Sequence, residues 1–459
     1  MQIVREARKN VASLWRRPNP SQSIYRPMKF LIQTQMDDGL LLYNVVTSEM
    51  VLLDGSERDA FMNLPDHYSK ELDELIARHY AVPVSFDENR SVRELRALLR
   101  KLEAPKRVSG FTILPTTECN ARCYYCFESD FNHCTMTEEI ANDVINYIVE
   151  KGKGEPVEIT WFGGEPLVAV KRISQICAGL KDKNVQFKST MVSNAYLFDT
   201  ELIQTAKNDW HLTGVQVTLD GTEAVYNETK AYVNPKCNPY VRVLHNIGLL
   251  LDSDIIVAIR LNVTDTNFTD LSDLIEELAA RFGGRKGFAG YSHAVYEGVG
   301  FRPLAYSDDN LVDDRTVELD AKLRAKGLMG SHSRLPNLRV VHCMADSDST
   351  RLIYPDGTIG KCENMPSSEG VGDIYHDIVD EKKNAWYKLT EQPTHCNDCC
   401  LFPSCFDLVT CPEAGKCTQV KRKWKKDSYT GLMRDTYLKY KHNEHQSNQE
   451  RSICEDCES

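Results

Sequence analysis

Apolar runs alternate with helical patterns through the middle of the chain. Five runs predict strands, at 111–114, 157–162, 185–192, 214–219 and 255–263. Helical stretches separate or follow them, at 137–150, 168–180, 199–208, 241–251 and 271–282. Thr135 and Glu138 form a capping-box pattern at the start of the first helix. Strands that alternate with helices indicate βα units and a parallel sheet.

One face of these predicted strands is polar, although buried parallel strands are usually apolar throughout. The alternating polar residues are Glu158, Thr160, Gln216, Thr218, Asp220, Arg260 and Asn262. Side chains at alternate positions share one face of a strand. The pattern therefore favours a barrel with a lumen that binds a polar ligand, and the alternative is an edge strand that faces water.

The two ends of the chain have different patterns. Before the barrel, strands are predicted at 29–34, 40–46 and 50–53 and helices at 56–64, 69–79 and 92–102, which gives a separate domain at 25–105. The barrel then occupies 108–300. A Cys-rich region at 335–425 has few periodic elements, so metal ligation would supply much of its order. A basic, solvated helix and tail are predicted at 426–459.

Composition narrows the class of protein. The chain has 459 residues, 42% of them apolar, and a formal net charge of −11. This acidic balance argues against binding to nucleic acid or to a membrane surface. No run of 18 apolar residues and no secretory signal is found, so we expect a cytoplasmic protein. In that reducing compartment, the clustering of most of the 16 Cys indicates metal binding rather than disulfides.

Three of these Cys lie directly after the first predicted strand of the barrel. Cys119, Cys123 and Cys126 are separated by three and two residues. A short loop can wrap three thiolates around a cubane iron–sulfur cluster, which normally takes four. One iron would then stay open for a ligand. The alternatives are a zinc site, or Cys134 as a fourth ligand.

This CxxxCxxC pattern resembles the radical S-adenosylmethionine (SAM) superfamily. The resemblance implies a partial (β/α)6 TIM-like barrel and a [4Fe–4S] cluster with an open iron that chelates SAM. Reductive cleavage of SAM would then give a 5′-deoxyadenosyl radical, which abstracts a hydrogen atom from the substrate.

The resemblance also assigns SAM contacts to residues that match family motifs. They are Tyr125 near the adenine, the segment Gly163, Gly164, Glu165 and Pro166 near the amino group, and Ser193, Asn194, Arg260 and Asn262 near the ribose and carboxylate. Ala195 departs from the glycine that commonly follows the Asn. A structural salt bridge from Arg260 to Asp220 is the alternative to a carboxylate contact.

The C-terminal Cys resemble the SPASM extension, which holds two auxiliary [4Fe–4S] clusters. By order, the resemblance implies one cluster on Cys396, Cys399, Cys405 and Cys417 and another on Cys343, Cys362 and Cys411. The fourth ligand of the second cluster is either Cys400 or no protein residue. For both sites, zinc is the alternative metal. Cys454 and Cys457 receive no role.

The N-terminal domain resembles the winged-helix-like elements of ribosomal-peptide (RiPP) maturases, which bind a leader peptide at a sheet edge. We therefore expect a maturase that installs a thioether or carbon–carbon cross-link in a precursor peptide. An electron donor such as flavodoxin or ferredoxin would serve it. The alternatives are a sulfatase-maturating type of enzyme that oxidises a Cys or Ser, and a non-enzymatic iron–sulfur protein.

Overall fold

The structure is a computed structural model that describes residues 1–15, 24–295, 311–329, 334–387, 394–405 and 418–455. Cys411, Cys417 and Cys457 lie outside these residues, and the side chain of Cys454 is not described. Among the helices in these ranges, none is both long and apolar enough to cross a membrane.

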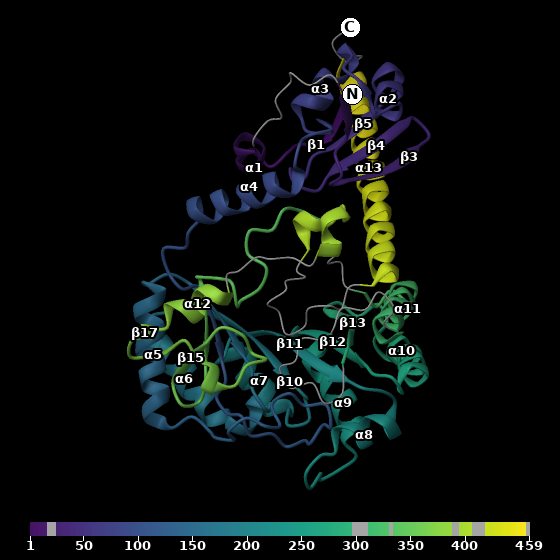
Figure 1. Ribbon diagram of the computed structural model, residues 1–459. Helices are drawn as coiled ribbons and strands as arrows, with labels where there is room; N and C mark the ends of the chain where they lie inside the picture. The colour runs from purple at the N-terminus through teal and green to yellow at the C-terminus, as the bar shows by residue number, and fades with distance from the viewer. Residues whose placement is uncertain (16–23, 296–310, 330–333, 388–393, 406–417, 456–459) are drawn as a thin grey trace.

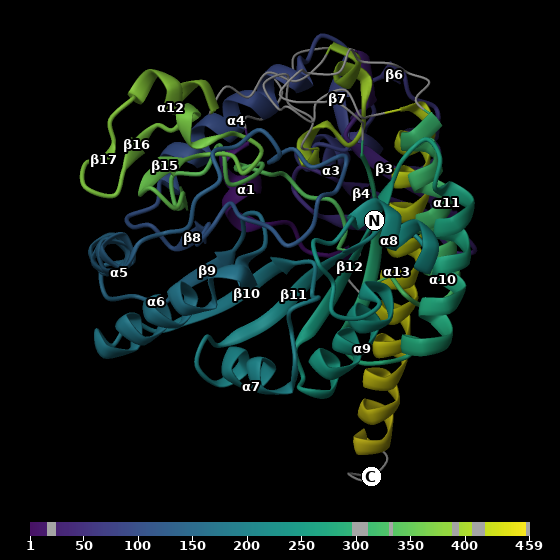
Figure 2. The ribbon, with the colours of Figure 1, turned by 90° about the horizontal axis from the view of Figure 1, so that it is seen from below.

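Parallel strands in chain order form the centre of the molecule (Figure 2). They are β8 (Gly110–Ile113), β9 (Val157–Trp161), β10 (Phe187–Ser193), β11 (Leu212–Leu219), β12 (Ile256–Val263) and β13 (Phe288–Ala294). Each pairs in parallel with the next, and β13 does not pair with β8, so the described sheet stays open. The five predicted strands are confirmed, and β13 is an addition to them.

Helices that alternate with these strands along the chain cover one side of the sheet (Figure 2). They are α5 (Glu138–Gly152), α6 (Val170–Asp182), α7 (Thr200–Asn208), α8 (Glu223–Lys230), α9 (Pro239–Asp252), α10 (Phe268–Phe282) and α11 (Leu311–Ala325). Their apolar faces and the strands share one core. The predicted capping box at Thr135 is wrong. Thr137 caps α5 by accepting a hydrogen bond from the Ile140 N–H, whereas Thr135 forms a β-bridge with Thr116.

The Cys-rich region extends the same sheet beyond β8. Strand β14 (Thr350–Ile353) pairs in parallel with β8, and β15 (Thr358–Gly360), β16 (Gly372–Asp373) and β17 (Asp377–Ile378) follow as antiparallel strands. A short helix, α12 (Glu381–Tyr387), comes next. The segment that carries Cys343 and Cys362 is therefore joined to the barrel by backbone hydrogen bonds.

The N-terminal domain has its own core. Its larger sheet has the order β1 (Gln2–Arg5), β5 (Met50–Leu53), β4 (Gly39–Asn44) and β3 (Leu31–Met36). A smaller sheet contains β6 (Asp66–His67), β2 (Ile24–Pro27) and β7 (Ala81–Pro83). The helices are α1 (Lys9–Leu14), α2 (Gly55–Met62), α3 (Asp73–Ala77) and α4 (Glu88–Leu102). The larger sheet starts at Gln2, well before the predicted boundary at 25, because β1 completes its edge beside β5.

A long C-terminal helix, α13 (Gln419–Glu455), connects the two parts (Figure 1). It contacts α11 at the end of the parallel sheet and β3 in the N-terminal domain. Met433 and Tyr437 are buried in the N-terminal core. The prediction of a solvated helix is wrong for this face, because aromatic and aliphatic residues recur on it.

Candidate active site

The loop after β8 carries Cys119, Cys123 and Cys126, all half-buried. Burial raises the pKa of Cys119 to about 12, with smaller contributions from Glu165 and from the other two thiols. Burial likewise raises the pKa of Cys126 to about 11. Thiolates at these positions require a nearby positive charge, which a metal cluster supplies. The donor type therefore fits a cluster, although no three acidic, His or Cys side chains in the described ranges converge as a formed metal site.

Cys134 lies at the base of this loop. Its backbone carbonyl accepts hydrogen bonds from the N–H and hydroxyl of Thr117, at 2.9 and 3.2 Å. The Thr117 hydroxyl also accepts a hydrogen bond from the Cys134 N–H at 2.9 Å. Cys134 thus closes the loop through its backbone, beside Glu118 and Asp356.

The Gly-Gly-Glu-Pro turn after β9 presses against the segment that leads into Cys119. A Cβ atom on Gly163, which has φ +109°, would lie 2.3 Å from the carbonyl oxygen of Thr116. A Cβ atom on Gly164 would lie 2.4 Å from that of Glu118. The Glu165 N–H donates to the same Glu118 carbonyl at 2.9 Å. The two glycines are required because any side chain would push the cysteine loop away from the sheet.

Glu165 is fully buried and connects this turn to the end of β10. Its carboxylate accepts hydrogen bonds from the Ser193 hydroxyl at 2.8 Å, the Asn194 N–H at 2.8 Å and the Leu167 N–H at 3.1 Å. Burial raises the pKa of Glu165 to about 7, and these hydrogen bonds oppose that rise. Pro166 begins a short 3-10 helix, Pro166–Ala169. The structure thus brings the predicted residues Glu165, Ser193 and Asn194 together. The Glu165 carboxylate is hydrogen-bonded to other groups of the protein, whereas the resemblance placed it near the amino group of SAM.

Asn194 continues this network to the cysteine loop. Its side-chain amide donates to the Asn120 Oδ1 at 2.7 Å. The Asn120 Nδ2 is buried and has no partner in the described chain. Ala195 has φ +60°, a left-handed conformation that favours glycine. The departure from the family's Asn-Gly therefore falls at the position where glycine relieves strain.

The polar face of the sheet lies at β11, β12 and β13. The register places Thr218, Arg260 and Tyr291 side by side. The Arg260 Nε donates to the Asn262 Oδ1 at 3.0 Å, and the Tyr291 hydroxyl donates to Gln216 at 2.8 Å. These side chains form a polar layer with donors that suit an anionic ligand.

Two sequence-based statements about this face are settled by the contacts. The salt bridge from Arg260 to Asp220, which was the alternative to a SAM contact, is not formed, because the Asp220 carboxylate pairs with Lys230 at 3.1 Å. Glu158 is largely exposed and pairs with Lys188 at 2.9 Å, because it lies near the start of β9.

Tyr125, Asp220 and Lys230 form a buried cluster beside the cysteine loop. The Tyr125 hydroxyl donates to Asp220 at 2.6 Å, and the Lys230 ammonium lies 3.1 Å from both partners. Burial would lower the pKa of Lys230, but the charges of Asp220 and Cys123 hold it well above its ordinary value. The backbone carbonyl of Lys230 also accepts the Arg122 N–H at 2.9 Å. Lys230 was missed in the sequence analysis because no helix was predicted where α8 lies.

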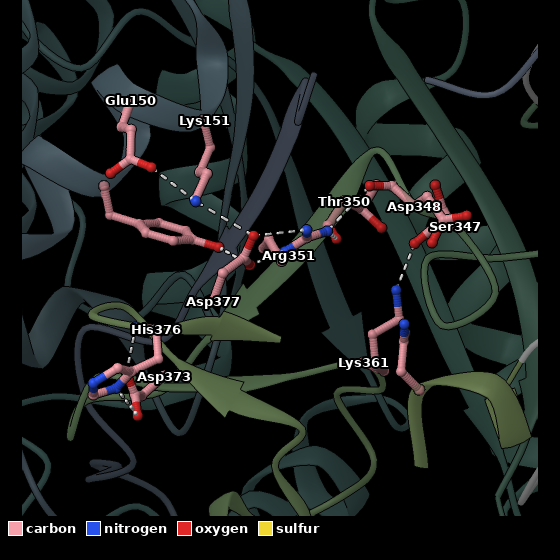
Figure 3. Close-up of polar contacts among 12 residues, drawn as sticks. Glu150, Lys151, Ser347, Asp348, Thr350, Arg351, Lys361, Asp373, His376 and Asp377 are labelled. Atoms are coloured by element: carbon pink, nitrogen blue, oxygen red, sulfur yellow. Dashed lines mark hydrogen bonds and ion pairs between the residues drawn. The ribbon is translucent and has the colours of Figure 1, made fainter. Parts of the chain in front are cut away.

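The C-terminal Cys are divided between two parts of the molecule. Cys343 and Cys362 flank the β14–β15 hairpin. Figure 3 shows how this hairpin is fixed: Asp377 receives a hydrogen bond from Arg351 at 2.9 Å. Tyr147 of α5 also donates to the Asp377 carboxylate, at 2.7 Å. Buried Lys361 donates to the carbonyl of Ser347 (Figure 3).

The other described C-terminal Cys lie around two short 3-10 helices, Thr394–Asp398 and Phe402–Ser404. Cys396 is in the first helix, Cys399 and Cys400 lie between the two, and Cys405 follows the second. Phe402 of this segment stacks on Phe30 of the N-terminal core. Arg96 of α4 donates to the carbonyls of Phe402 and Pro403, both at 2.8 Å. The His342 Nδ1 lies 3.1 Å from the Cys405 carbonyl, which brings the two Cys segments into contact.

Comparison with known proteins defines the class. Residues 113–278 match the model of the Radical SAM superfamily. They form a radical SAM domain, and the chain is a radical SAM enzyme. The superfamily implies a [4Fe–4S] cluster and SAM.

Solved structures share this fold at low sequence identity. One is anSMEcpe with bound AdoMet, with a TM-score of 0.55, 14% identity, 73% of this chain and 96% of that chain covered. Another is SuiB of Streptococcus suis bound to the precursor peptide SuiA, with a TM-score of 0.50, 13% identity, 86% of this chain and 99% of that chain covered. No curated protein sequence matches the chain.

Proposed function

We propose that this protein is a peptide maturase that holds its catalytic [4Fe–4S] cluster on Cys119, Cys123 and Cys126. The observation that carries the proposal is the placement of these three half-buried thiols on one short loop, which the Gly163–Gly164 turn holds against the sheet. When bound, the cluster supplies the electron that cleaves SAM to a 5′-deoxyadenosyl radical.

The chain's own residues would position SAM against this loop. Arg260 and Asn262 supply donors for its carboxylate and ribose from the polar face of β12. Glu165 holds Ser193 and Asn194 in place, and Asn194 in turn orients Asn120 between two of the Cys. The unpartnered Asn120 Nδ2 is a donor that a bound SAM would satisfy. Tyr125 would face the adenine from its anchor on Asp220.

The substrate in this proposal is a ribosomally made precursor peptide, and the product is an intramolecular thioether or carbon–carbon cross-link. The N-terminal domain, with its separate core and its edge strand β3, supports binding of the leader peptide. A structural relative, SuiB, is bound to a precursor peptide. A sulfatase-maturating type of enzyme is the second candidate. It needs no leader-binding domain, so the separate N-terminal domain supports the first candidate.

Two auxiliary [4Fe–4S] clusters are part of the proposal. Cys396, Cys399 and Cys405 share one segment and would bind one cluster with Cys417. Cys343 and Cys362 share the hairpin and would bind the other with Cys411, with Cys400 as an optional fourth ligand. An electron donor such as flavodoxin or ferredoxin would reduce the protein in the cytoplasm.

The test is to count iron and sulfide in anaerobically reconstituted protein and to assay 5′-deoxyadenosine after reduction with SAM. We expect about twelve irons per chain, and about eight with no deoxyadenosine in a Cys119/Cys123/Cys126→Ala variant. Cys237→Ala is the matched control, because Cys237 is exposed and belongs to none of the proposed sets. Stoichiometric zinc with no SAM cleavage would contradict the proposal.

A further inference from the structure

A groove lies between the N-terminal domain, the C-terminal Cys segment and α13. Its volume is about 530 Å³. It is lined by Pro27, Met28, Lys29, Leu31, Gln33, Asp398, Cys399, Cys400, Leu401, Arg422, Lys423 and Lys426. Three segments that are far apart in the sequence thus build one concave surface.

The groove is basic although the chain is acidic. Lys29, Arg422, Lys423 and Lys426 line it, against the single carboxylate of Asp398, whereas the whole chain has a net charge of −11. Lys423 and Lys426 are exposed, and their ammonium groups form no ion pair with any described side chain. Because these two lysines stand on a concave surface without a described acidic partner, they raise the local concentration of anions, and the groove favours an acidic ligand.

The floor of the groove is apolar. Met28, Leu31 and Leu401 are all less than a tenth exposed. Leu31 and Gln33 are alternate residues of β3, which is the edge strand of its sheet. Acidic residues interleaved with apolar ones would match such a surface.

The size of the groove distinguishes between two kinds of acidic partner. A globular electron carrier binds through a broad and fairly flat surface, of up to roughly 600 Å² on each side in weak redox complexes, and does not need to fill a concavity. A concavity of about 530 Å³ is instead in the range that accommodates a few side chains of a bound segment. The observations therefore favour a short peptide segment over a folded acidic protein.

We propose that this groove binds an acidic, amphipathic segment of the precursor peptide, so that Lys423 and Lys426 select a leader with carboxylates interleaved among apolar residues. The inference rests on the proposed function and specifies its substrate. The Cys399–Cys400 wall would place the bound segment beside the proposed auxiliary site.

The test measures fluorescence anisotropy of a labelled twelve-residue peptide of alternating Glu and Leu, titrated with the reconstituted full-length protein. A second peptide replaces every Glu with Gln. The charge reversal K423E/K426E alters two exposed side chains of the groove. K171E/K439E is its control, because Lys171 of α6 and Lys439 of α13 are exposed, unpaired with described residues and outside the groove.

We expect K423E/K426E to weaken binding of the Glu peptide at least tenfold and the control variant to weaken it less than threefold. The Gln peptide should bind weakly to all three proteins, and binding of the Glu peptide should fall with added salt. Equal losses in the two variants, or no loss in either, would overturn the proposal.

Two further readouts separate the outcomes. SAM cleavage by the wild-type preparation with dithionite tests the proposed function alone. If no SAM were cleaved, the proposed function would be wrong, whereas peptide binding to the groove would still be judged by anisotropy. SAM cleavage driven by reduced flavodoxin tests whether the groove instead binds the electron carrier. If K423E/K426E lost flavodoxin-driven cleavage but kept its affinity for the Glu peptide, the groove would be a docking site for the electron carrier and the proposal would be wrong.

Discussion

The two Cys-bearing regions of this protein are built in different ways. The loop at 117–134 follows one strand and is held by residues at the ends of its neighbours, such as Glu165 after β9 and Asn194 after β10. The C-terminal Cys are divided between a hairpin on the barrel and a segment on the N-terminal core. The first site therefore depends on one sheet, and the second depends on how separate parts of the chain meet.

The difference has a physical consequence. In the barrel site the contacts are short in range and buried, so one substitution should disturb the loop directly. In the C-terminal region the contacts are between α4, α5 and distant loops, so substitutions should loosen one segment and leave the loop at 117–134 intact. Four variants test this difference between the two regions.

The largest effect is expected for Lys230→Met. The change leaves the buried carboxylate of Asp220 without its ion-pair partner, which typically costs about 3–5 kcal/mol. Chemical denaturation should show the loss, and iron binding by the loop should fall with it. Lys188→Met is the control, because its pair with Glu158 is exposed and should cost less than about 1 kcal/mol. Similar costs for the two variants would contradict the account.

Gly164→Ala should come next. Its Cβ would lie 2.4 Å from the Glu118 carbonyl, so the turn or the cysteine loop must shift, at a cost of about 3 kcal/mol. The iron retained per chain after gel filtration should decrease by about the four irons of one cluster. Gly248→Ala in α9 has open space around its Cβ and should be neutral or slightly stabilising. Full retention of iron by Gly164→Ala would argue against the close contact.

Arg96→Met tests the other region. Arg96 donates to two carbonyls of the Cys segment, and its loss should cost about 2 kcal/mol. Hydrogen exchange should increase at 396–405 and stay unchanged at 117–134. Exposed Arg90, paired with Glu94, supplies the control Arg90→Met. Faster exchange in the barrel loop would show that the two regions are coupled.

The smallest effect is expected for Asp377→Asn on the β14–β17 hairpin. Burial alone would raise the pKa of Asp377, but hydrogen bonds from Arg351 and Tyr147 and the nearby charges lower it to about 2. The pKa is depressed in the folded state, so the carboxylate stabilises the fold above its unfolded pKa of about 3.9 and loses this contribution as pH falls toward 2. The variant should therefore be less stable than wild type by about 1–2 kcal/mol at pH 7, below the roughly 2.6 kcal/mol of the full pKa shift because the carboxylate is partly exposed to solvent.

The difference between Asp377→Asn and wild type should shrink below about pH 4. Thermal midpoints of both proteins between pH 7 and pH 3 measure this. A difference that grows on acidification would contradict the assignment of Asp377 as an ionised partner of Arg351.

The sequence predicted most of the barrel because its signals are local. Each apolar run between helical patterns specifies one βα unit, and the Cys and Gly motifs lie at strand ends. Lys230 could not be predicted, since a lysine at the end of a polar helix gives no sign of burial. The pairing of Asp220 with Lys230 could not be predicted either, because it depends on where α8 ends.

The N- and C-terminal regions were harder to predict for a related reason. Strand β1 pairs with β5 and strand β14 pairs with β8 across long stretches of sequence, and short strands have weak periodicity. The buried face of α13 becomes apparent only when β3 is placed against it.

In the proposed function, Cys119, Cys123 and Cys126 hold a cluster whose open iron binds SAM. The most direct measurement is the electron paramagnetic resonance spectrum of the dithionite-reduced protein with and without SAM. SAM should change the spectrum of the wild type and leave that of the Cys119/Cys123/Cys126→Ala variant unchanged. A wild-type spectrum that does not respond to SAM, or a variant that still responds, would show that these Cys do not hold a SAM-binding cluster.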